Sequence, residues 1–264
     1  MILVCLEAAD RYYYLFPNSV LKNEGVLYIM EATKRPDRRR RRPDRRMNGK
    51  GAESLKVLLV NGSPHEKGCT YTALAEIART LEEEGIETEI FFIGNKPIPG
   101  CMDCGGCRKL GRCVIDDVVN EFTAKAYDAD GFIFGSPVHF AGAGGAVTSF
   151  LDRAFFSGFG SGRRAFYLKP AACIVSARRA GTTAAFDQLI KYFTISEMPV
   201  ISSQYWNMVH GTKPSEVLQD KEGLQIMRTL ARNMAWFLKC KEAGQKAGVP
   251  LPAREERAIT NFIR

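Results

Sequence analysis

The residues with the clearest capacity for chemistry are four cysteines in one short stretch, arranged as CxxCxxCx5C. They are Cys101, Cys104, Cys107 and Cys113. Four cysteine ligands are what a [4Fe–4S] cluster takes, and the spacing of the first three cysteines matches the bacterial ferredoxin motif, although the last gap is five and no proline follows Cys113. Zinc sites more often use two separated CxxC pairs. The pattern favours a cluster first, unligated or disulfide-forming cysteines second, and zinc third.

A turn rich in small residues, 62–70, precedes a predicted helix and is suited to bind a phosphate. Backbone N–H groups at a helix start face an anion, and the helix dipole favours its negative charge. Ser63 and Thr70 offer hydroxyl donors, while His65 and Lys67 offer positive charge. The alternative is a simple helix cap with Thr70 as the N-cap residue. The turn has neither the Walker lysine pattern nor the spacing of a dinucleotide fingerprint.

Two further loops have the composition expected around a flat ring. Residues 135–145, GSPVHFAGAGG, combine apolar and aromatic side chains with glycines, so they can flank a ring while backbone N–H groups bind its polar edge. Residues 176–183, SARRAGTT, form a flexible polar loop, in which Arg178 or Arg179 would favour a negatively charged reduced flavin. The alternative for residues 135–145 is a glycine-rich turn with buried aromatic side chains. The alternative for Arg178 and Arg179 is that they are ordinary surface charges.

These loops lie between short apolar segments and longer amphipathic ones, an alternation that predicts β-α-β units. Because strands of this kind are buried on both faces, helices should cover both sides of the sheet. We therefore expect an α/β fold with a flavodoxin-like, doubly wound five-stranded parallel sheet of order 2-1-3-4-5, whose ligands bind beyond the carboxyl ends of the strands. The expected strands are 56–61, 86–93, 131–135, 171–176 and 200–204, and the expected helices are 70–84, 117–127, 145–156, 183–194 and 224–240.

Three segments carry a resemblance to a known family: VNGSPHEKGCT, GSPVHFAGAGGAVTSFLDR and SARRAGTTAAF. They resemble the NADPH-dependent FMN reductase group of the flavodoxin-like superfamily over about residues 55–240. Together with the cysteine array, the chain resembles the iron–sulfur flavoproteins, in which a cluster passes single electrons to FMN. The resemblance implies FMN as cofactor and NAD(P)H as co-substrate, with the flavin rather than a side chain carrying the chemistry.

The resemblance also implies which residues bind these groups. Relatives commonly have Asn or Ser at position 69 and Tyr at position 139, so Cys69 and His139 depart from the pattern. The implied FMN-binding residues are Ser63, His65, Gly68, Cys69, Thr70, Pro137, Val138, His139, Phe140, Ala177, Arg178 and Gly181, and the implied metal ligands are Cys101, Cys104, Cys107 and Cys113.

The formal net charge of +8 is concentrated near the N-terminus. Residues 1–50 hold 12 Lys and Arg against 6 Asp and Glu, which leaves 25 against 23 for the rest of the chain. A run such as Arg38 to Arg42 is usually disordered and is able to bind polyanions. We expect residues 1–54 to form a poorly ordered basic extension, 55–243 an FMN-binding domain with the Cys-rich loop 100–114, and 244–264 a C-terminal tail. Met47 is the expected native start.

The order of charged and apolar residues in 1–46 does not match a secretory signal, and the apolar runs are far shorter than the roughly 20 residues of a membrane-spanning helix. Eight cysteines without a signal predict reduced thiols in the cytoplasm. The main hypothesis is an FMN-dependent oxidoreductase that moves electrons from NAD(P)H or ferredoxin to a small-molecule acceptor. We expect a homodimer or homotetramer with no membrane or nucleic-acid partner. The alternatives are a cluster-free flavin or quinone reductase and a zinc-stabilised nucleic-acid-binding module.

Overall fold

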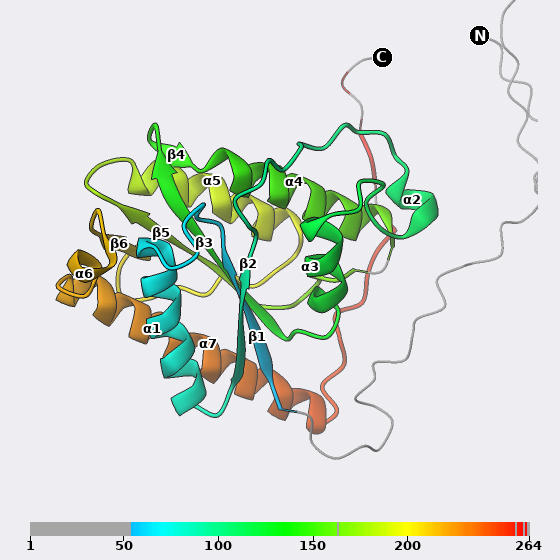
Figure 1. Cartoon of the computed structure of the whole chain (residues 1–264). Helices are drawn as coiled ribbons and strands as arrows, with labels where there is room; N and C mark the ends of the chain where they lie inside the picture. The colour runs from blue at the N-terminus through cyan, green and yellow to red at the C-terminus, as the bar shows by residue number, and fades with distance from the viewer. Residues whose placement is uncertain (1–53, 163, 257, 261, 263–264) are drawn as a thin grey trace, which may run out of the picture. The chain divides into compact units, whose positions relative to one another are not determined.

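A twisted parallel sheet forms the centre of the fold (Figure 1). The computed structural model describes residues 54–162, 164–256, 258–260 and 262. Its parallel strands follow the order β2-β1-β3-β5-β6, and the two-residue β4 pairs antiparallel with the end of β3. With β4 off this path, the order is the predicted flavodoxin-like one, and that prediction is confirmed. The strands are β1 (Lys56–Asn61), β2 (Glu87–Phe92), β3 (Gly131–His139), β4 (Gly142–Ala143), β5 (Ala171–Ala177) and β6 (Met208–His210).

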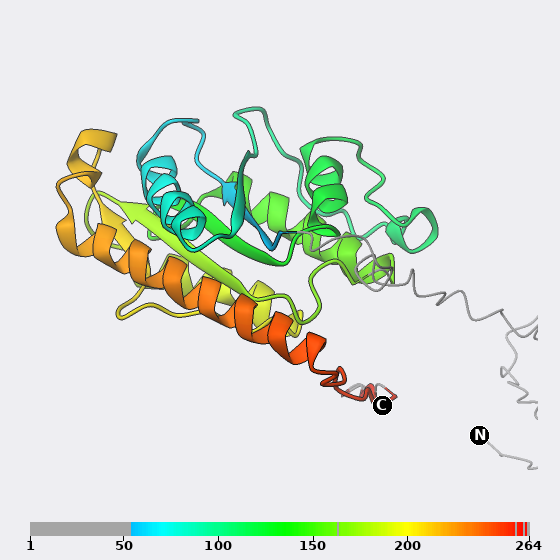
Figure 2. The ribbon, with the colours of Figure 1, turned by 90° about the horizontal axis from the view of Figure 1, so that it is seen from below.

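Helices connect the strands and cover both faces of the sheet, as Figures 1 and 2 show. On one face α1 packs beside α7, and on the other α3, α4 and α5 share a core with the strands. Two short helices, α2 and α6, were not predicted. The helices are α1 (Cys69–Glu83), α2 (Cys107–Leu110), α3 (Val118–Ala126), α4 (Gly145–Gly160), α5 (Thr182–Ile195), α6 (Pro214–Val217) and α7 (Lys221–Lys246).

Strand β1 shows why the sheet needs cover on both sides. Successive side chains of a strand point to opposite faces. Leu58 and Val60 therefore join the core beneath α3, α4 and α5, whereas Val57 and Leu59 join the core beneath α1 and α7. All four side chains are at most 1% exposed. A strand that is apolar at every position must be buried on both faces, as the sequence predicted.

The predicted fifth strand, 200–204, is wrong. Val200 forms only an isolated bridge with Ala171, and the edge strand of the sheet is β6, which pairs with the carboxyl half of β5. The buried Asn207 secures this edge. Its backbone carbonyl accepts a hydrogen bond from Val175 N at 3.0 Å, and its side-chain amide donates to Cys173 O at 3.0 Å. Backbone pairing with the carboxyl half of β5 therefore defines Met208–His210 as the edge strand.

Several sequence predictions concern residues outside the described part of the chain. The arginine run, the expected start at Met47 and nearly all of the basic extension 1–54 belong to this group. The domain boundaries therefore stay predictions. Within the described residues, no helix combines the length and the apolarity that a bilayer crossing requires.

The core beneath α3 and α4 depends on Phe122, whose ring centroid lies within 6.2 Å of those of five other phenylalanines. We expect Phe122→Ala to lower the free energy of unfolding by about 3–5 kcal/mol, because it leaves a cavity among packed rings. Urea denaturation measures this change. Phe159→Ala, at a side chain that is half exposed on α4, is the control and should cost less than about 1 kcal/mol. Equal losses for the two variants would contradict this account of the core.

Candidate functional site

Loops that follow β1, β3 and β5 meet at the carboxyl edge of the sheet. The backbone N–H of Gly62, after β1, donates to the carbonyl of Gly135 in β3 at 3.0 Å. The hydroxyls of Thr70, at the start of α1, and Ser176, near the end of β5, hydrogen bond at 2.8 Å. A Cβ on Gly62 would lie 2.3 Å from Val147 Cγ2, so only glycine permits this approach. The three loops proposed from the sequence are thus neighbours in space.

Asn61 shapes the loop between β1 and α1. Its fully buried side chain donates from Nδ2 to Glu66 O at 2.9 Å and accepts from Ser63 N at 3.2 Å. Helix α1 then begins after Gly68, which supplies no side-chain cap, and its first turn contains no acidic residue. The first backbone N–H groups of α1 are therefore open to an anion. Asn61 was missed by the sequence analysis, although a polar residue that ends a buried strand beside a small-residue turn is a usable signal.

The predicted phosphate-binding side chains of this loop have different surroundings. Ser63 is buried, and its Oγ accepts a hydrogen bond from His65 N at 3.1 Å, whereas the side chain of His65 is exposed. The Cys69 thiol donates to Gly211 O at 3.6 Å, which ties α1 to the segment after β6. Thr70 lies inside α1, and its hydroxyl hydrogen bonds to that of Ser176. The N-cap residue is Gly68, so the alternative interpretation of Thr70 as the N-cap is wrong.

The loop after β3 is a tight hairpin made by two residues that are not glycine. Phe140 and Ala141 have φ values of 48° and 60°, which is the left-handed conformation that a two-residue type I′ turn requires. Residues with a Cβ rarely adopt it, so surrounding contacts must hold the turn. One such contact comes from Gly181, where an added Cβ would lie 2.6 Å from Ala141 Cα. The hairpin and the loop after β5 therefore adjoin each other.

The remaining predicted flavin-binding residues lie along the same edge of the sheet. Pro137 and Val138, at the end of β3, are half-buried, while His139 is exposed. Ala177 ends β5 in a buried position, and Arg178 follows it with an exposed side chain. The edge thus carries apolar side chains at the end of β3 and a cation directly after β5.

The four cysteines lie in the loop after β2 and line a single pocket together with Arg153. Cys101 and Cys104 are exposed, Cys113 is half-buried and Cys107 is buried. A Cβ on Gly160 at the end of α4 would lie 2.6 Å from Cys107 Sγ, so this sulfur packs directly onto the helix backbone. Burial raises the pKa of the Cys107 thiol, and the neighbouring thiols add to the effect.

The donor set of this pocket fits a [4Fe–4S] cluster. All four cysteines are free thiols, and four thiolates around one cavity are the ligands that such a cluster uses. Among the described residues, no three His, Cys, Asp or Glu side chains are arranged to hold a single metal ion. Each of the four irons of such a cluster would take one cysteine sulfur, so the four cysteine sulfurs would surround a volume and need not converge on a single point.

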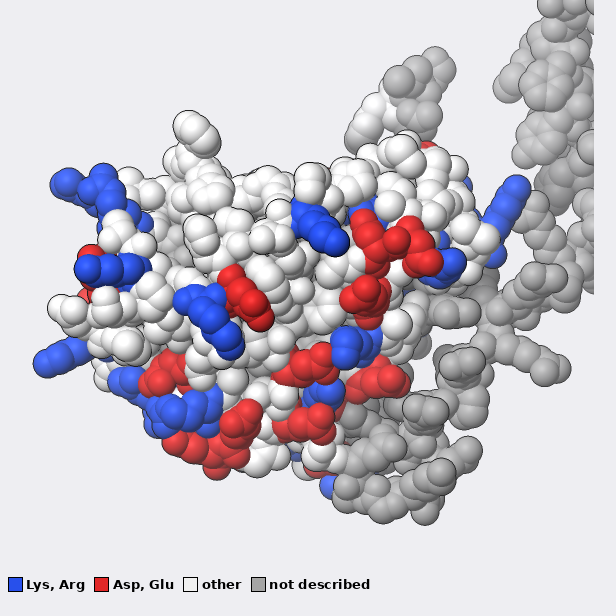
Figure 3. Space-filling view, in the orientation of Figure 1, with Lys and Arg blue, Asp and Glu red and all other residues white. Residues whose placement is uncertain are grey.

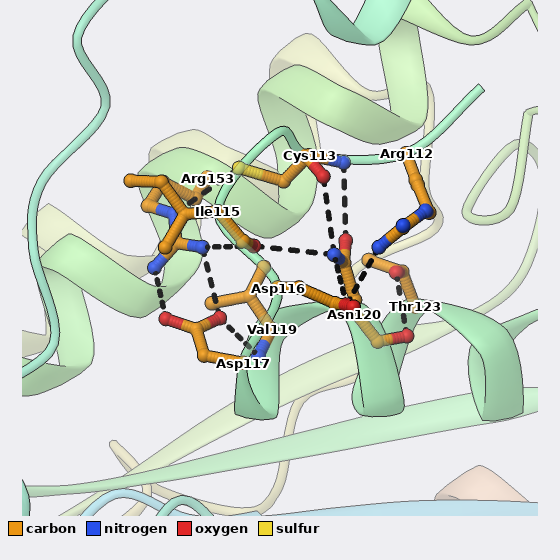
Figure 4. Close-up of polar contacts among 9 residues, drawn as sticks. All are labelled: Arg112, Cys113, Ile115, Asp116, Asp117, Val119, Asn120, Thr123 and Arg153. Atoms are coloured by element: carbon orange, nitrogen blue, oxygen red, sulfur yellow. Dashed lines mark hydrogen bonds and ion pairs between the residues drawn. The ribbon is translucent and has the colours of Figure 1, made fainter. Parts of the chain in front are cut away.

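Two polar side chains fix the last part of the cysteine loop, as Figure 4 shows. Arg153 on α4 is 1% exposed and donates from Nη1 and Nη2 to the two carboxylate oxygens of Asp117 at 2.6 and 2.8 Å. Asn120 on α3 donates to the carbonyls of Cys113 and Ile115, both at 3.1 Å, and accepts from Cys113 N at 3.0 Å. The sequence analysis missed both residues. The available signal for Arg153 was a lone cation on an otherwise apolar helix.

Comparison with known proteins places the chain in a family. The sequence profile described as NADPH-dependent FMN reductase matches residues 55–213. The chain belongs to the NADPH-dependent FMN reductase family. As a member, the protein is a flavin-dependent oxidoreductase with FMN as its cofactor, and these predictions from the sequence are confirmed.

The sequence of this FMN reductase family member aligns with iron–sulfur flavoproteins over nearly the whole length of those relatives. It is 30% identical over 194 residues to Iron-sulfur flavoprotein MJ1083 of Methanocaldococcus jannaschii, covering 70% of this chain and 98% of the relative. It is 26% identical over 201 residues to an iron-sulfur flavoprotein of Archaeoglobus fulgidus, covering 70% and 98%. The predicted resemblance to iron–sulfur flavoproteins is thereby confirmed.

Solved structures agree on the fold of this FMN reductase family member. FerB of Paracoccus denitrificans, an NAD(P)H:acceptor oxidoreductase, superposes with a TM-score of 0.54 at 14% identity, covering 70% of this chain and 98% of FerB. RosB with bound 8-demethyl-8-formylriboflavin-5′-phosphate gives a TM-score of 0.54 at 15% identity, covering 80% and 94%. At these identities the likeness concerns the fold alone.

The close approach at Gly62 gives a direct test of the edge where the three loops meet. We expect Gly62→Ala to weaken FMN binding at least about tenfold and to lower the free energy of unfolding by about 1–3 kcal/mol, because the added methyl displaces the loop from β3. Fluorescence titration with FMN measures the affinity. Gly100→Ala, where an added Cβ has open space, is the control and should leave both quantities unchanged. Unaltered FMN affinity in Gly62→Ala would contradict this placement of the site.

Proposed function

We propose that this enzyme takes electrons from NAD(P)H or ferredoxin and passes them through FMN and a [4Fe–4S] cluster to a small-molecule acceptor. The observation that carries the proposal is the single pocket lined by all four cysteines. The names of relatives at 26–30% identity, iron-sulfur flavoproteins that align over 98% of their own length, support it.

The residues at the carboxyl edge of the sheet would bind FMN, which supplies hydride and single-electron chemistry when bound. The open backbone N–H groups at the start of α1 and the hydroxyl of Ser63 would hold the phosphate. Pro137 and Val138 would lie against the ring, and Arg178 would favour a negatively charged reduced flavin. In this proposal the protein binds and orients the flavin, and no side chain acts as an acid or a base.

In the proposed arrangement the four cysteines would hold the cluster from the loop after β2. The buried Cys107 and the half-buried Cys113 are fixed by contacts to α4 and α3, whereas Cys101 and Cys104 lie on the exposed side of the pocket. Two fixed ligands and two on the open side would allow a cluster to enter from solvent. Because two of the four ligands are already fixed, the cluster would assemble on a largely preformed site.

A cluster-free flavin or quinone reductase is the second candidate, and the observation in its favour is that all four cysteines are free thiols. The zinc-stabilised nucleic-acid-binding module has less support. On the face shown in Figure 3, basic and acidic side chains of the described residues are interspersed. Ion pairs such as Lys56 with Glu89 and Arg79 with Glu76 offset part of the positive charge. Nucleic-acid sites instead concentrate positive charge on one face.

We further propose a cytoplasmic homodimer or homotetramer. Free thiols suit a reducing compartment. The ring of Phe140 is fully exposed at the tip of the β3–β4 hairpin, beside the proposed flavin site, and an apolar ring in that position is suited to lie against a second subunit. Light scattering on the purified protein measures the mass in solution, and a monomer would refute this part of the proposal.

An absorption spectrum of anaerobically purified protein tests the proposed function. We expect flavin bands above a broad brown shoulder, with iron and acid-labile sulfide at about four of each per chain, because a [4Fe–4S] cluster has that composition. Flavin bands with no iron would establish the cluster-free reductase instead. A colourless protein that also fails to bind added FMN would refute both.

Replacing single cysteines tests which residues hold the cluster. We expect Cys104→Ser to lose most of the iron, since it removes one of four ligands, and to retain FMN, since the flavin site is built from other loops. Cys240→Ser is the matched control, because this exposed cysteine lies on α7 outside the pocket, and it should retain full iron content. Iron analysis and the ratio of the broad cluster absorbance to the flavin absorbance measure the loss of the cluster. Equal iron loss in both variants would argue against the assigned ligands.

A further inference from the structure

The guanidinium of Arg153 lies against one of the four cysteine sulfurs. Its Nε donates a hydrogen bond to Cys113 Sγ at 3.3 Å, from a side chain that is 1% exposed and lines the cysteine pocket (Figure 4). A buried cation beside a metal-ligating sulfur has a stronger electrostatic effect than the same cation in water, because the local dielectric constant is lower. Arg153 is therefore placed to influence whatever charge the cysteines carry.

The other donors of Arg153 hold it in this orientation. Nη1 and Nη2 bind the two carboxylate oxygens of Asp117, Nη2 also donates to Ile115 O at 2.9 Å, and Nη1 donates to Pro99 O at 3.4 Å. The guanidinium is a rigid planar fork, so these bonds leave only Nε to face the sulfur. Arg153 thus contacts the cysteine loop before its first cysteine and after its last one.

Arg153 keeps its positive charge in this setting. An arginine guanidinium stays protonated in proteins, and the carboxylate of Asp117, bound at 2.6 and 2.8 Å, favours the charged form. The carboxylate of Asp117 is partly exposed and offsets some of that charge. The charge near Cys113 therefore depends on both members of the pair.

We propose that Arg153 is a positioning residue that orients Cys113 and raises the reduction potential of a [4Fe–4S] cluster held by the four cysteines, an inference that rests on the proposed function. Reduction adds one electron and therefore one unit of negative charge to the cluster and its thiolates, with no proton required. A fixed N–H donor and a positive charge at one sulfur stabilise the reduced form more than the oxidised form. Hydrogen bonds to the ligand sulfurs are among the main determinants of such potentials.

A purely structural role for Arg153 makes a different prediction, and Asp117 separates the two. Asp117→Asn breaks the ion pair while keeping an amide side chain that can still cap α3, where Asp117 now accepts from Val119 N at 3.0 Å. Both Arg153→Gln and Asp117→Asn loosen the loop, so a structural effect would shift the potential in the same direction. Tuning by charge predicts opposite directions, because one variant removes the cation and the other leaves it unneutralised.

The experiment is a redox titration of the wild type and of the variants. Electron paramagnetic resonance or visible absorbance measures how much of the cluster is reduced at each potential. We expect Arg153→Gln to lower the midpoint potential and Asp117→Asn to raise it, while Arg153→Lys, which keeps the charge but not the planar fork, falls between Arg153→Gln and the wild type. Shifts of the same sign in Arg153→Gln and Asp117→Asn, or no shift in either, would overturn the inference.

Iron and sulfide content of the wild type separates failure of this inference from failure of the proposed function. A wild type without cluster would remove both proposals. A wild type with a cluster, but with potentials that do not depend on Arg153, would remove only this one. If Arg153→Gln does not fold, Asp117→Asn decides alone, and a potential at or below that of the wild type would be the contrary result.

Discussion

Burial of the parallel sheet on both faces is the constraint on which the rest of the structure depends. Strands that are apolar at every position must be covered by helices on each side, and each helix connects the carboxyl end of one strand to the next. The loops after β1, β3 and β5 therefore emerge at one edge. Contacts such as Gly62 N to Gly135 O and Thr70 to Ser176 then draw them together into one site. The proposed flavin site is thus a consequence of how the sheet is covered.

The cysteine loop depends on a second, more local interaction. Beyond its short helix α2, it relies on side chains from α3 and α4 to fix its position. Arg153 and Asn120 each contribute three of these bonds. Arg153 is buried and pairs with a partly exposed Asp117, and burying an ionised side chain is often no more stabilising than burying an apolar residue of the same size. A charged clamp at this position is better explained by its effect on Cys113 than by stability. The same contacts that order the loop also set the charge around the proposed cluster.

Most of the fold was predictable because strands and helices leave a periodic record in the sequence. The apolar runs of β1, β2 and β5 and the amphipathic stretches of α1, α3 and α5 were found to within one residue at each end, whereas β3 and α7 extend beyond their predicted bounds. The edge strand was misplaced because the apolar pair Val200 and Ile201 suggested a strand there, while β6 is defined by hydrogen bonds to β5. Short elements such as β4, α2 and α6 have too few residues to show a period.

The sequence by itself determined the parallel sheet and the spacing of the four cysteines, because apolar periodicity and residue spacing are local properties that can be read along the chain. It indicated the family through three segments that resemble known relatives. Only the tertiary structure decided that Arg153 and Asp117, which lie on different helices, meet beside Cys113, and that Asn61 holds the loop before α1. It also decided which glycines permit two loops to touch. These facts depend on distances between segments far apart in sequence, and no local pattern encodes such distances.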